Sequence, residues 1–567
     1  MKQYYVQALF LSIILISLLL RLFLLGEIPA GLTNDEADIG YDAYSVLLTG
    51  KDQWGQFLPA TSFKGFGDYR LPAYTYLVVP TVHFFGLSEF SVRLPSAIFG
   101  TLSVVIIYFL AVKLFEREKY KRIIGIASMV LLGISPWAMG LSRIGIESNV
   151  AIAFFLIAFL IFLSSKKNIY LLLLSFVLFA STVYIYTSYA LFTPLSLVVL
   201  LWMRRDDLKG QRNAVIAGIF IFVLLVIPLF VFRSATGVRI SQVSFINSQD
   251  NVGILADLND RRGSCDEVLP SIICKVFQNK PAVFANTFIQ NYLNHFSLNF
   301  LFLNGTSTQY SILPPRSLFY TFELVLFTAG VLAIFVRRVR AGYMALLLLL
   351  ISSLPDSVTG NGHFSRASTM MPFVILIESF GCAYAYRYFK NYKKTGIMLL
   401  ILALFIILYS VLSFISAYFT YFPKQYSIYS QYGYKELMGK IDSSKTRYSK
   451  IYISKHSNDT KQYIYQLFYQ KYDPVKFQNK QNVSYTDSSD GWVSIDKIDN
   501  IYYTAKIPSE ADLVQQGGKV LLVSHPSEFP KDIEILDSVK LRNGNVQFVF
   551  VDKDVLLDYY KNQSNLE

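Results

Sequence analysis

Long apolar runs alternate with short hydrophilic gaps along the chain as far as about residue 418. A bilayer core takes roughly 20 apolar residues for each helical span. Candidate spans lie near residues 6–26, 94–115, 123–139, 148–164, 169–184, 186–203, 214–232, 317–336, 341–354, 366–386 and 395–418. The pattern predicts a mainly α, polytopic membrane protein with about 11 transmembrane helices.

One further apolar run, residues 71–87, reads LPAYTYLVVPTVHFFGL. Counting it as a full crossing would put Asp35 on the same side of the membrane as the basic segment 113–122. We therefore expect this run to lie in the interface or to re-enter the membrane, which its prolines also favour.

The basic residues gather in the gaps between candidate spans, and this changes what the net charge of +13 implies. In a soluble protein such a charge suggests nucleic acid as a partner. Here the clustering is typical of cytoplasmic loops, so we expect a multi-pass protein of the cell membrane that embeds in the lipid bilayer and binds no nucleic acid. The basic gaps are residues 113–122, 166–167, 204–212, 337–340 and 387–394.

With these gaps inside, the other segments between spans fall on the extracytoplasmic side. They are residues 27–93, 140–147, 233–316 and 355–365. The C-terminal part also falls outside, and its stretches KIYIS, KVLLVS and VQFVFV alternate as strands do. We predict a transmembrane domain of residues 1–419 and a soluble extracytoplasmic α/β domain of residues 420–567.

The three cysteines are too few and too widely spaced for a metal cluster or a disulfide framework. Cys265 and Cys274 are expected to pair if their loop is extracytoplasmic. No disulfide is predicted for Cys382.

Acidic residues mark the start of a predicted helix in the first external segment. Thr33 and Glu36 have the T-x-x-E spacing of a capping box. Asp35, between them, would meet the positive end of the helix dipole. Two interpretations of these residues therefore stay open: they cap the helix, or they take part in catalysis.

The spacing of further acids along this helix favours the catalytic reading. In a helix from 34 to 49, Asp35, Asp38 and Asp42 share one face, and apolar residues form another. We expect this helix to lie on the bilayer surface with its acids facing inward. Such a helix would gather carboxylates just outside the membrane.

Another charged motif, KGFGDYR, follows in the same external segment and contains Lys64, Asp68 and Arg70. These residues are candidates for substrate binding. A solvated loop carries the same residue types, so that alternative stays open.

Two later external loops carry arginines close to a span. Arg143 and Glu147 are four residues apart, which fits either a plain helical ion pair or an arginine that grips a phosphate. His363 and Arg366 stand at the mouth of the span near 366–386. A single histidine at a helix start is often structural, but with Arg366 one turn on we favour phosphate recognition.

The motifs together resemble the membrane glycosyltransferases of the GT-C superfamily, and the protein O-mannosyltransferase and aminoarabinose transferase branch in particular. The resemblance covers roughly residues 5 to 420. It is carried by TNDEADIGYDAYSVLLTGKDQWG, FGDYRLPAYTYL, FGLSEFSVRLPSAIFGTLSVVIIYFL, SPWAMGLSRIGIE and HFSRA.

The resemblance implies an inverting transfer of a sugar from a polyprenyl-phosphate donor at the extracytoplasmic face. It implies that Asp35 is the general base and that Glu36 binds or orients the acceptor. It also assigns Arg143 and Arg366 to the donor phosphate. The acceptor stays open between a protein, a lipid and a polysaccharide.

The chemistry of this sugar transfer requires one general base and positive charge near the leaving phosphate. A carboxylate must take the proton of the acceptor hydroxyl as it attacks, whereas a lipid phosphate leaves with the help of positive charge. Asp35, Glu36 and His363 offer ligands for a divalent metal, but their spacing fits no standard site, so we predict none. The lipid-linked sugar is expected as donor substrate and no cofactor is certain.

Two other functions stay open. A transporter or flippase of lipid-linked sugars would also carry charges along its route, although it would place them at mid-membrane rather than in loops. The other alternative is a catalytically inactive relative whose C-terminal domain binds a glycan.

Overall fold

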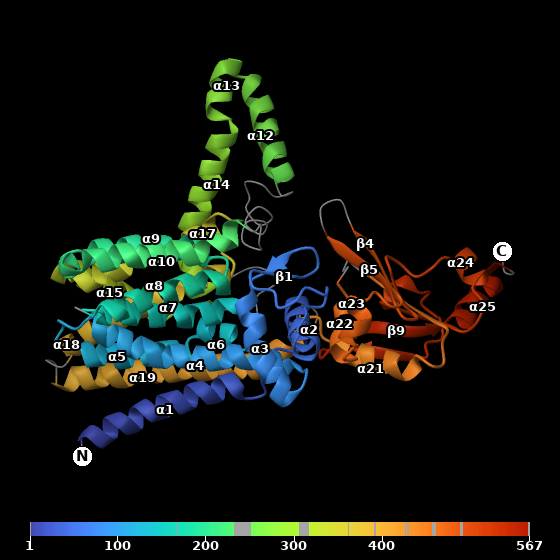
Figure 1. Ribbon diagram of the computed structural model, residues 1–567, viewed down its shortest axis with the longest axis horizontal. Helices are drawn as coiled ribbons and strands as arrows, with labels where there is room; N and C mark the ends of the chain where they lie inside the picture. The colour runs from blue at the N-terminus through green and yellow to red at the C-terminus, as the bar shows by residue number, and fades with distance from the viewer. Residues whose placement is uncertain are drawn as a thin grey trace. The chain divides into compact units, whose positions relative to one another are not determined.

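The computed structural model describes most of the chain: residues 2–166, 168–231, 251–305, 317–360, 362–389, 393–425, 427, 430–455, 461–487 and 492–564. The chain divides into two compact units (Figure 1). The first comprises Met1–Phe23 and Ser96–Ile415, and the second Leu24–Pro95 and Ser416–Glu567.

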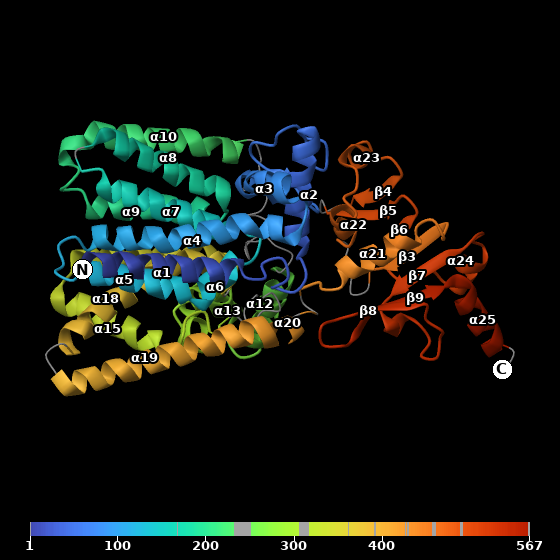
Figure 2. The same ribbon diagram turned by 90° about the horizontal axis from the view of Figure 1, so that it is seen from below.

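Long helices that run side by side make up the first unit (Figures 1 and 2). A helix lies on each predicted span, which confirms the mainly α membrane architecture. In chain order the helices are α1 (Lys2–Leu22), α4 (Glu89–Leu114), α5 (Lys121–Ile134), α7 (Glu147–Ser164), α8 (Ile169–Ile185), α9 (Tyr189–Met203), α10 (Arg212–Val231), α15 (Glu323–Arg337), α16 (Arg340–Ser352), α18 (Met371–Phe389) and α19 (Lys393–Ser416).

Not all of these helices are long enough to cross a bilayer unaided. In the described part of the chain, six helical segments are long and apolar enough to span a membrane. The number is up to seven if α5 and the bent continuation α6 (Pro136–Ser142) form one span. The chain is therefore a multi-pass membrane protein, and eleven crossings remain a prediction.

Two small residues let helices α15 and α18 pack closely. A Cβ on Gly330 would lie 2.1 Å from the carbonyl oxygen of Ile377, and one on Gly381 would lie 2.1 Å from that of Leu326. Small residues at such crossings allow backbones of membrane helices to approach. Any larger side chain at either position would force these helices apart.

A helical hairpin, α12 to α14, runs across the direction of the bundle helices (Figure 1). It consists of α12 (Asn251–Asp266), α13 (Ser271–Phe277) and α14 (Lys280–Asn294). Cys265 and Cys274 form a disulfide at its turn, which is the pairing expected for an extracytoplasmic loop. Other parts of the predicted external loop 233–316, residues 233–250 and 306–316, lie outside the described residues.

The second unit contains a seven-stranded sheet of order β4-β5-β6-β3-β7-β9-β8. Strand β3 runs parallel to β6 and β7, and the other pairs are antiparallel. The strands are β3 (Lys450–Ser454), β4 (Val483–Asp487), β5 (Val493–Ile498), β6 (Ile501–Thr504), β7 (Val520–Ser524), β8 (Asp537–Lys540) and β9 (Val546–Asp552).

The three stretches predicted as strands fall on β3, β7 and β9. Strand β7 is buried along its whole length, as expected of a central strand covered on both faces. Helices pack beside the sheet and complete the predicted α/β domain. They are α21 (Tyr434–Ser444), α22 (Tyr463–Tyr469), α23 (Pro474–Gln478), α24 (Glu510–Val514) and α25 (Lys553–Ser564).

The first predicted external loop packs with this sheet domain, whereas the sequence placed it in the domain of residues 1–419. It forms α2 (Asn34–Thr49), α3 (Pro72–Phe85) and the short strands β1 (Phe63–Lys64) and β2 (Tyr69–Arg70). The Tyr41 hydroxyl donates to the carbonyl of Tyr472 at 3.0 Å. The Tyr465 hydroxyl donates to that of Leu32 at 2.9 Å.

Helix α2 does not expose its apolar face, contrary to the expectation that it lies on the bilayer surface. Ile39 is 2% exposed and Ala43 is 0% exposed. A Cβ on Gly40 would lie 2.5 Å from the ring of Phe468 on α22. Side chains of α22 therefore cover this face. The sequence alone predicted that lipid would cover it.

Helix α3 occupies the apolar run 71–87 and has 14 residues with Pro80 inside. A span takes roughly 20 residues, so α3 alone is too short to cross a bilayer. This length agrees with the non-crossing placement, which stays a prediction.

We expect the disulfide to form in the membrane-embedded protein, because cysteines pair in oxidising compartments. Peptide mass spectrometry without reductant should find Cys265 and Cys274 joined. Cys274→Ser should make Cys265, the less buried of the two, reactive toward an impermeant maleimide added outside intact cells. Labelling that requires broken cells would contradict the predicted side of this loop.

Candidate functional site

The capping box predicted at Thr33 is present at the start of α2. The Glu36 amide donates to the Thr33 hydroxyl at 3.2 Å, and the Thr33 amide donates to the Glu36 carboxylate at 3.1 Å. Arg93 donates to the same carboxylate at 2.8 Å. Glu36 is 2% exposed, and these contacts show that it stabilises the start of α2. Its role in orienting the acceptor stays a prediction.

Asp35 lies beside Glu36 in a different environment. Its side chain is exposed and makes no hydrogen bond or ion pair with the described residues. It stands in the first turn of α2, where the helix dipole favours negative charge. Asp35 is thus a carboxylate open to a ligand.

Asp38 and Asp42 share one cation. Arg70 approaches the carboxylate of Asp38 at 2.6 Å and that of Asp42 at 2.7 Å. Gln53 binds both acids, with its side-chain amide donating to Asp38 and its backbone amide donating to Asp42 at 3.0 Å. We call Asp38, Asp42 and Arg70 the buried triad, because all three are nearly excluded from water.

The buried triad has more negative than positive charge if both acids ionise. Burial, only partly offset by Arg70, raises the pKa of Asp38 from 3.8 to about 6. Burial and the neighbouring Asp38 raise the pKa of Asp42 well above its usual value. The pair therefore keeps a proton at a pH where an ordinary aspartate has lost it.

The motif KGFGDYR forms a hairpin that delivers Arg70 to the triad. Strands β1 and β2 pair Lys64 with Tyr69, and the Gly65 amide donates to the Asp68 carbonyl at 2.9 Å. A Cβ on Gly65 would lie 2.7 Å from a carboxylate oxygen of Asp68 and 3.0 Å from one of Asp38. Only glycine fits at this turn without displacing these acids.

The substrate-binding residues predicted from this motif differ in accessibility. Lys64 lies over the ring of Trp54, with its ammonium 5.0 Å from the ring centre. Lys64 and Asp68 are half-buried. Arg70 is 2% exposed and also donates to the backbone carbonyl of Asp35 at 3.2 Å. Arg70 thus holds the helix that carries Asp35.

In the first unit, Arg143 is fully buried at the end of α1. Its guanidinium donates to the carbonyls of Leu20 at 2.8 Å, Arg21 at 3.1 Å and Phe23 at 2.7 Å. A cation suits the carbonyls at a helix C-terminus. These bonds make Arg143 a cap of α1, and its phosphate role stays a prediction.

Arg143 and Glu147 do not share a helix, unlike the i, i+4 pair considered from the sequence. Arg143 follows the end of α6, and Glu147 begins α7. Glu147 is half-buried in the first turn of α7, where an acid is favoured by the dipole.

A buried carboxylate organises the HFSRA motif. Asp356 accepts a hydrogen bond from His295 at 2.9 Å and from the Arg366 guanidinium at 3.0 Å. The backbone amide of His363 donates to it at 2.7 Å. Burial acts to raise the pKa of Asp356, but His295 and Arg366 outweigh burial, and the pKa is lowered. Asp356 is thus held as an anion.

His363 and Arg366 differ in charge at neutral pH. Burial, reinforced by Arg366, lowers the pKa of His363 to about 4, so its ring is neutral and lies 2.9 Å from the hydroxyl of Ser365. The side chain of Arg366 is 27% exposed. Arg366 is the cation of this cluster that solvent or a ligand can reach.

The predicted site residues thus fall into two sets. Asp35, Glu36, Lys64, Asp68 and Arg70 belong to the second unit, and Arg143, Glu147, His363 and Arg366 to the first. In the part of the chain that the structure describes, no three His, Cys, Asp or Glu side chains are placed to hold a metal ion.

Four partners of these residues are not candidates from sequence. They are Gln53, Arg93, His295 and Asp356. Asp356 lies 61 residues from His295, and Arg93 lies 57 from Glu36, so no local spacing connects them. The shared face of Asp38 and Asp42 was a usable signal, since acids one helical turn apart can bind one common partner.

Comparison with known families gives one match, over residues 70–232, to the family described as dolichyl-phosphate-mannose-protein mannosyltransferase. The comparison with curated proteins gave no match. The matched segment contains the predicted phosphate-binding residue Arg143 but lies C-terminal to Asp35.

Two solved structures have a similar fold. One is ArnT from Cupriavidus metallidurans bound to undecaprenyl phosphate, with 11% identity, a TM-score of 0.51, and coverage of 96% of this chain and 97% of that chain. The other is the same protein in the apo state, with 11% identity, a TM-score of 0.51, and coverage of 98% and 99%. These two matches show that the chain shares its fold with ArnT. Together with the family match over residues 70–232, they support the predicted resemblance to membrane glycosyltransferases.

Removing Arg70 should destabilise the protein strongly. Arg70→Met leaves Asp38 and Asp42 buried without a cation, and breaking such a pair costs about 3–5 kcal/mol of unfolding free energy. The measurement is thermal unfolding of the purified full chain in detergent.

Asp42→Asn is the matched control, because it keeps the shape of the side chain and leaves Asp38 paired with Arg70. We expect it to lower the unfolding temperature far less than Arg70→Met does. Equal unfolding temperatures for the two variants would contradict the stabilising role of the triad.

Proposed function

We propose that the chain is an inverting glycosyltransferase that moves a sugar from a polyprenyl-phosphate donor to an acceptor hydroxyl at the extracytoplasmic face of the membrane. The fold shared with ArnT supports the proposal, since that protein was captured with undecaprenyl phosphate. The family match over residues 70–232 agrees with a lipid-linked sugar as donor.

The exposure of Asp35 is the observation that carries the proposal. The other acids in the body of α2, Glu36, Asp38 and Asp42, are buried and paired with arginines. A general base must be ionised and within hydrogen-bond reach of the hydroxyl proton. Asp35 suits this role, because it is open to solvent and stands where the helix dipole favours a carboxylate.

The leaving group sets the second requirement. A lipid phosphate departs as an anion, so positive charge rather than an acid eases its departure. We assign this role to Arg366, whose planar guanidinium suits phosphate oxygens. Asp356 holds the Nε of Arg366 at 3.0 Å, and His363 next to it is neutral and can contribute a hydrogen bond.

The side of the membrane is inferred from two features. The disulfide between Cys265 and Cys274 is typical of an oxidising compartment. The basic loops at the other ends of the spans are typical of the cytoplasm. We therefore propose that the hairpin α12 to α14 and the sheet domain are extracytoplasmic.

One observation favours a transporter of lipid-linked sugars as the second candidate. Glu323 of α15 and Glu378 of α18 are fully buried within membrane helices. No described residue makes a hydrogen bond to the carboxylate of Glu378. Ionisable residues inside membranes often mark transport routes. A transporter would keep its activity when Asp35 loses its charge.

We expect Asp35→Asn to abolish sugar transfer while the protein still folds. Loss of a positioned base typically costs about 10²- to 10⁴-fold in rate. Mass spectrometry of glycans and glycolipids in cells lacking the gene identifies the missing product, and each variant is scored by whether it restores that product.

Glu27→Gln is the control for this experiment. Glu27 is an exposed acid of the same segment, so the substitution removes a similar charge without touching α2. Restoration by both variants would reject Asp35 as the base. Restoration by neither, with both proteins folded, would show that any acid loss in this segment is harmful and would also reject the assignment.

Arg366→Ala should weaken use of the donor. Losing a hydrogen bond to a charged group corresponds to about a 10- to 100-fold fall in kcat/KM. The measurement is a titration of the donor with purified protein, and Arg366→Lys, which keeps the charge but not the planar fork, should lose less. An unchanged kcat/KM for the donor in Arg366→Ala would exclude the phosphate role.

A further inference from the structure

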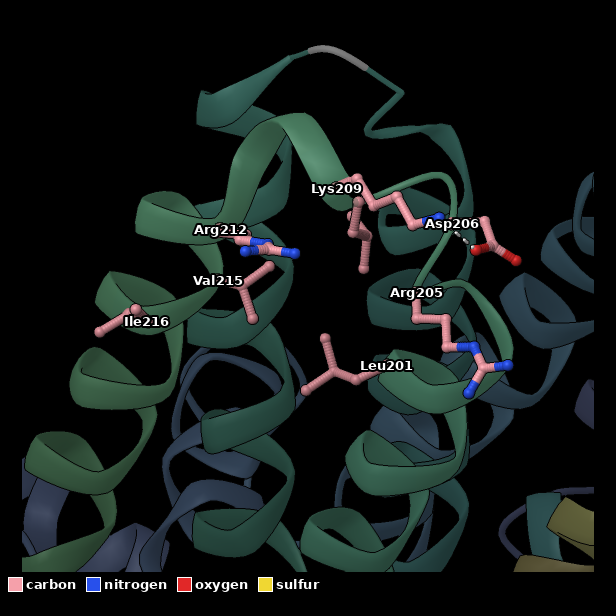
Figure 3. A pocket seen from close by; sticks show the side chains of 8 residues that line it. Leu201, Arg205, Asp206, Lys209, Arg212, Val215 and Ile216 are labelled. Atoms are coloured by element: carbon pink, nitrogen blue, oxygen red, sulfur yellow. Dashed lines mark ion pairs between the residues drawn. The ribbon is translucent and has the colours of Figure 1, made fainter.

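An open hollow of about 560 Å³ lies at the basic end of the bundle, between α9 and α10 (Figure 3). Leu201 from α9 and Val215 from α10 face one another across it, and the guanidinium of Arg212 lies above them. The short 3₁₀ turn η1 (Lys209–Gln211) lies in the loop that connects α9 to α10.

The charges around this hollow are unevenly matched. Arg205, Lys209 and Arg212 line it together with a single acid, Asp206. Lys209 pairs with Asp206 at 3.0 Å. Arg205 and Arg212 are exposed, and neither forms an ion pair with any residue that the structure describes. The rim of the hollow therefore has two guanidinium groups that form no close ion pair with the described residues.

A neighbouring hollow of about 320 Å³ is also lined by more basic residues than acids. Some of its cations are paired: Glu116 pairs with Lys113 at 3.1 Å and also with Lys166. Arg204 in its wall pairs with Asp207 at 3.1 Å. Several basic residues at this end of the bundle thus have acidic partners, whereas Arg205 and Arg212 have no ion-pair partner among the described residues.

The wall of the first hollow is apolar and continuous with a surface suited to lipid. Ile216, which lines it, is 66% exposed, and Trp202 beside Leu201 is 56% exposed. Tryptophan is enriched where membrane helices meet the headgroup layer. An occupant with an anionic head and hydrocarbon chains matches both parts of this site.

We propose that this hollow binds an acidic glycerophospholipid from the leaflet that the basic loops face. Its phosphodiester would accept hydrogen bonds from Arg205 and Arg212, whose guanidinium forks suit phosphate. Its acyl chains would lie along Leu201, Val215 and Ile216. Basic pockets between membrane helices bind lipid headgroups in this way.

Native mass spectrometry of the purified full chain tests the proposal, with phosphatidylglycerol and phosphatidylcholine as probes. We expect the first phosphatidylglycerol to bind more tightly than phosphatidylcholine. Each basic side chain near an anionic lipid contributes roughly fivefold in affinity, so Arg205→Ala combined with Arg212→Ala should weaken that binding about 25-fold. The two residues are exposed, and the variant is expected to fold.

Lys119→Ala combined with Arg122→Ala is the matched control. It removes the same charge from exposed positions outside the hollow, so we expect phosphatidylglycerol affinity to stay within about twofold of the wild type. Equal loss in both double variants, or equal affinity for the two lipids, would overturn the site. Displacement of phosphatidylglycerol by inorganic phosphate alone would overturn the assignment to a phospholipid.

Discussion

The position of Asp35 depends on one guanidinium. Arg70 holds Asp38 and Asp42 at 2.6 and 2.7 Å, and it also donates to the backbone carbonyl of Asp35 at 3.2 Å. Asp38 and Asp42 are one helical turn apart, so fixing both carboxylates fixes the rotation of α2 about its axis. The candidate base is thereby held through the helix that carries it rather than through its own side chain.

A separate ion pair, between Arg93 and Glu36, fixes the start of α2. Arg93 binds the carboxylate of Glu36 and donates to the carbonyls of Leu25 and Pro29, at 3.2 and 3.0 Å. The chain before the helix and the first helical turn are therefore tied to one side chain. Removing a buried partner of this kind leaves an uncompensated charge, so Arg93 and Arg70 each constrain the segment around Asp35.

Local features of this architecture were predictable, and long-range ones were not. Hydrophobic runs placed the bundle helices, alternation placed β3, β7 and β9, and the T-x-x-E spacing placed the start of α2. These signals depend on neighbours a few residues apart. The contact of Asp356 with His295, the cap that Arg143 forms on α1, and the cover of α2 by α22 depend on residues brought together by tertiary packing. Spacing could identify an acidic face on α2, but only burial separates Asp38 and Asp42 from Asp35.

The proton kept by Asp38 and Asp42 has a consequence for the net charge beside α2. Two ionised carboxylates that share one arginine would leave a negative charge uncompensated in the interior, and like charges oppose ionisation. Because burial raises the pKa of both Asp38 and Asp42, and because Arg70 balances a carboxylate that does ionise, the triad adds little net negative charge. Helix α2 is then anchored by a cluster that is close to neutral. A buried cluster that takes no direct part in proton transfer thus fixes the helix that carries the exposed Asp35.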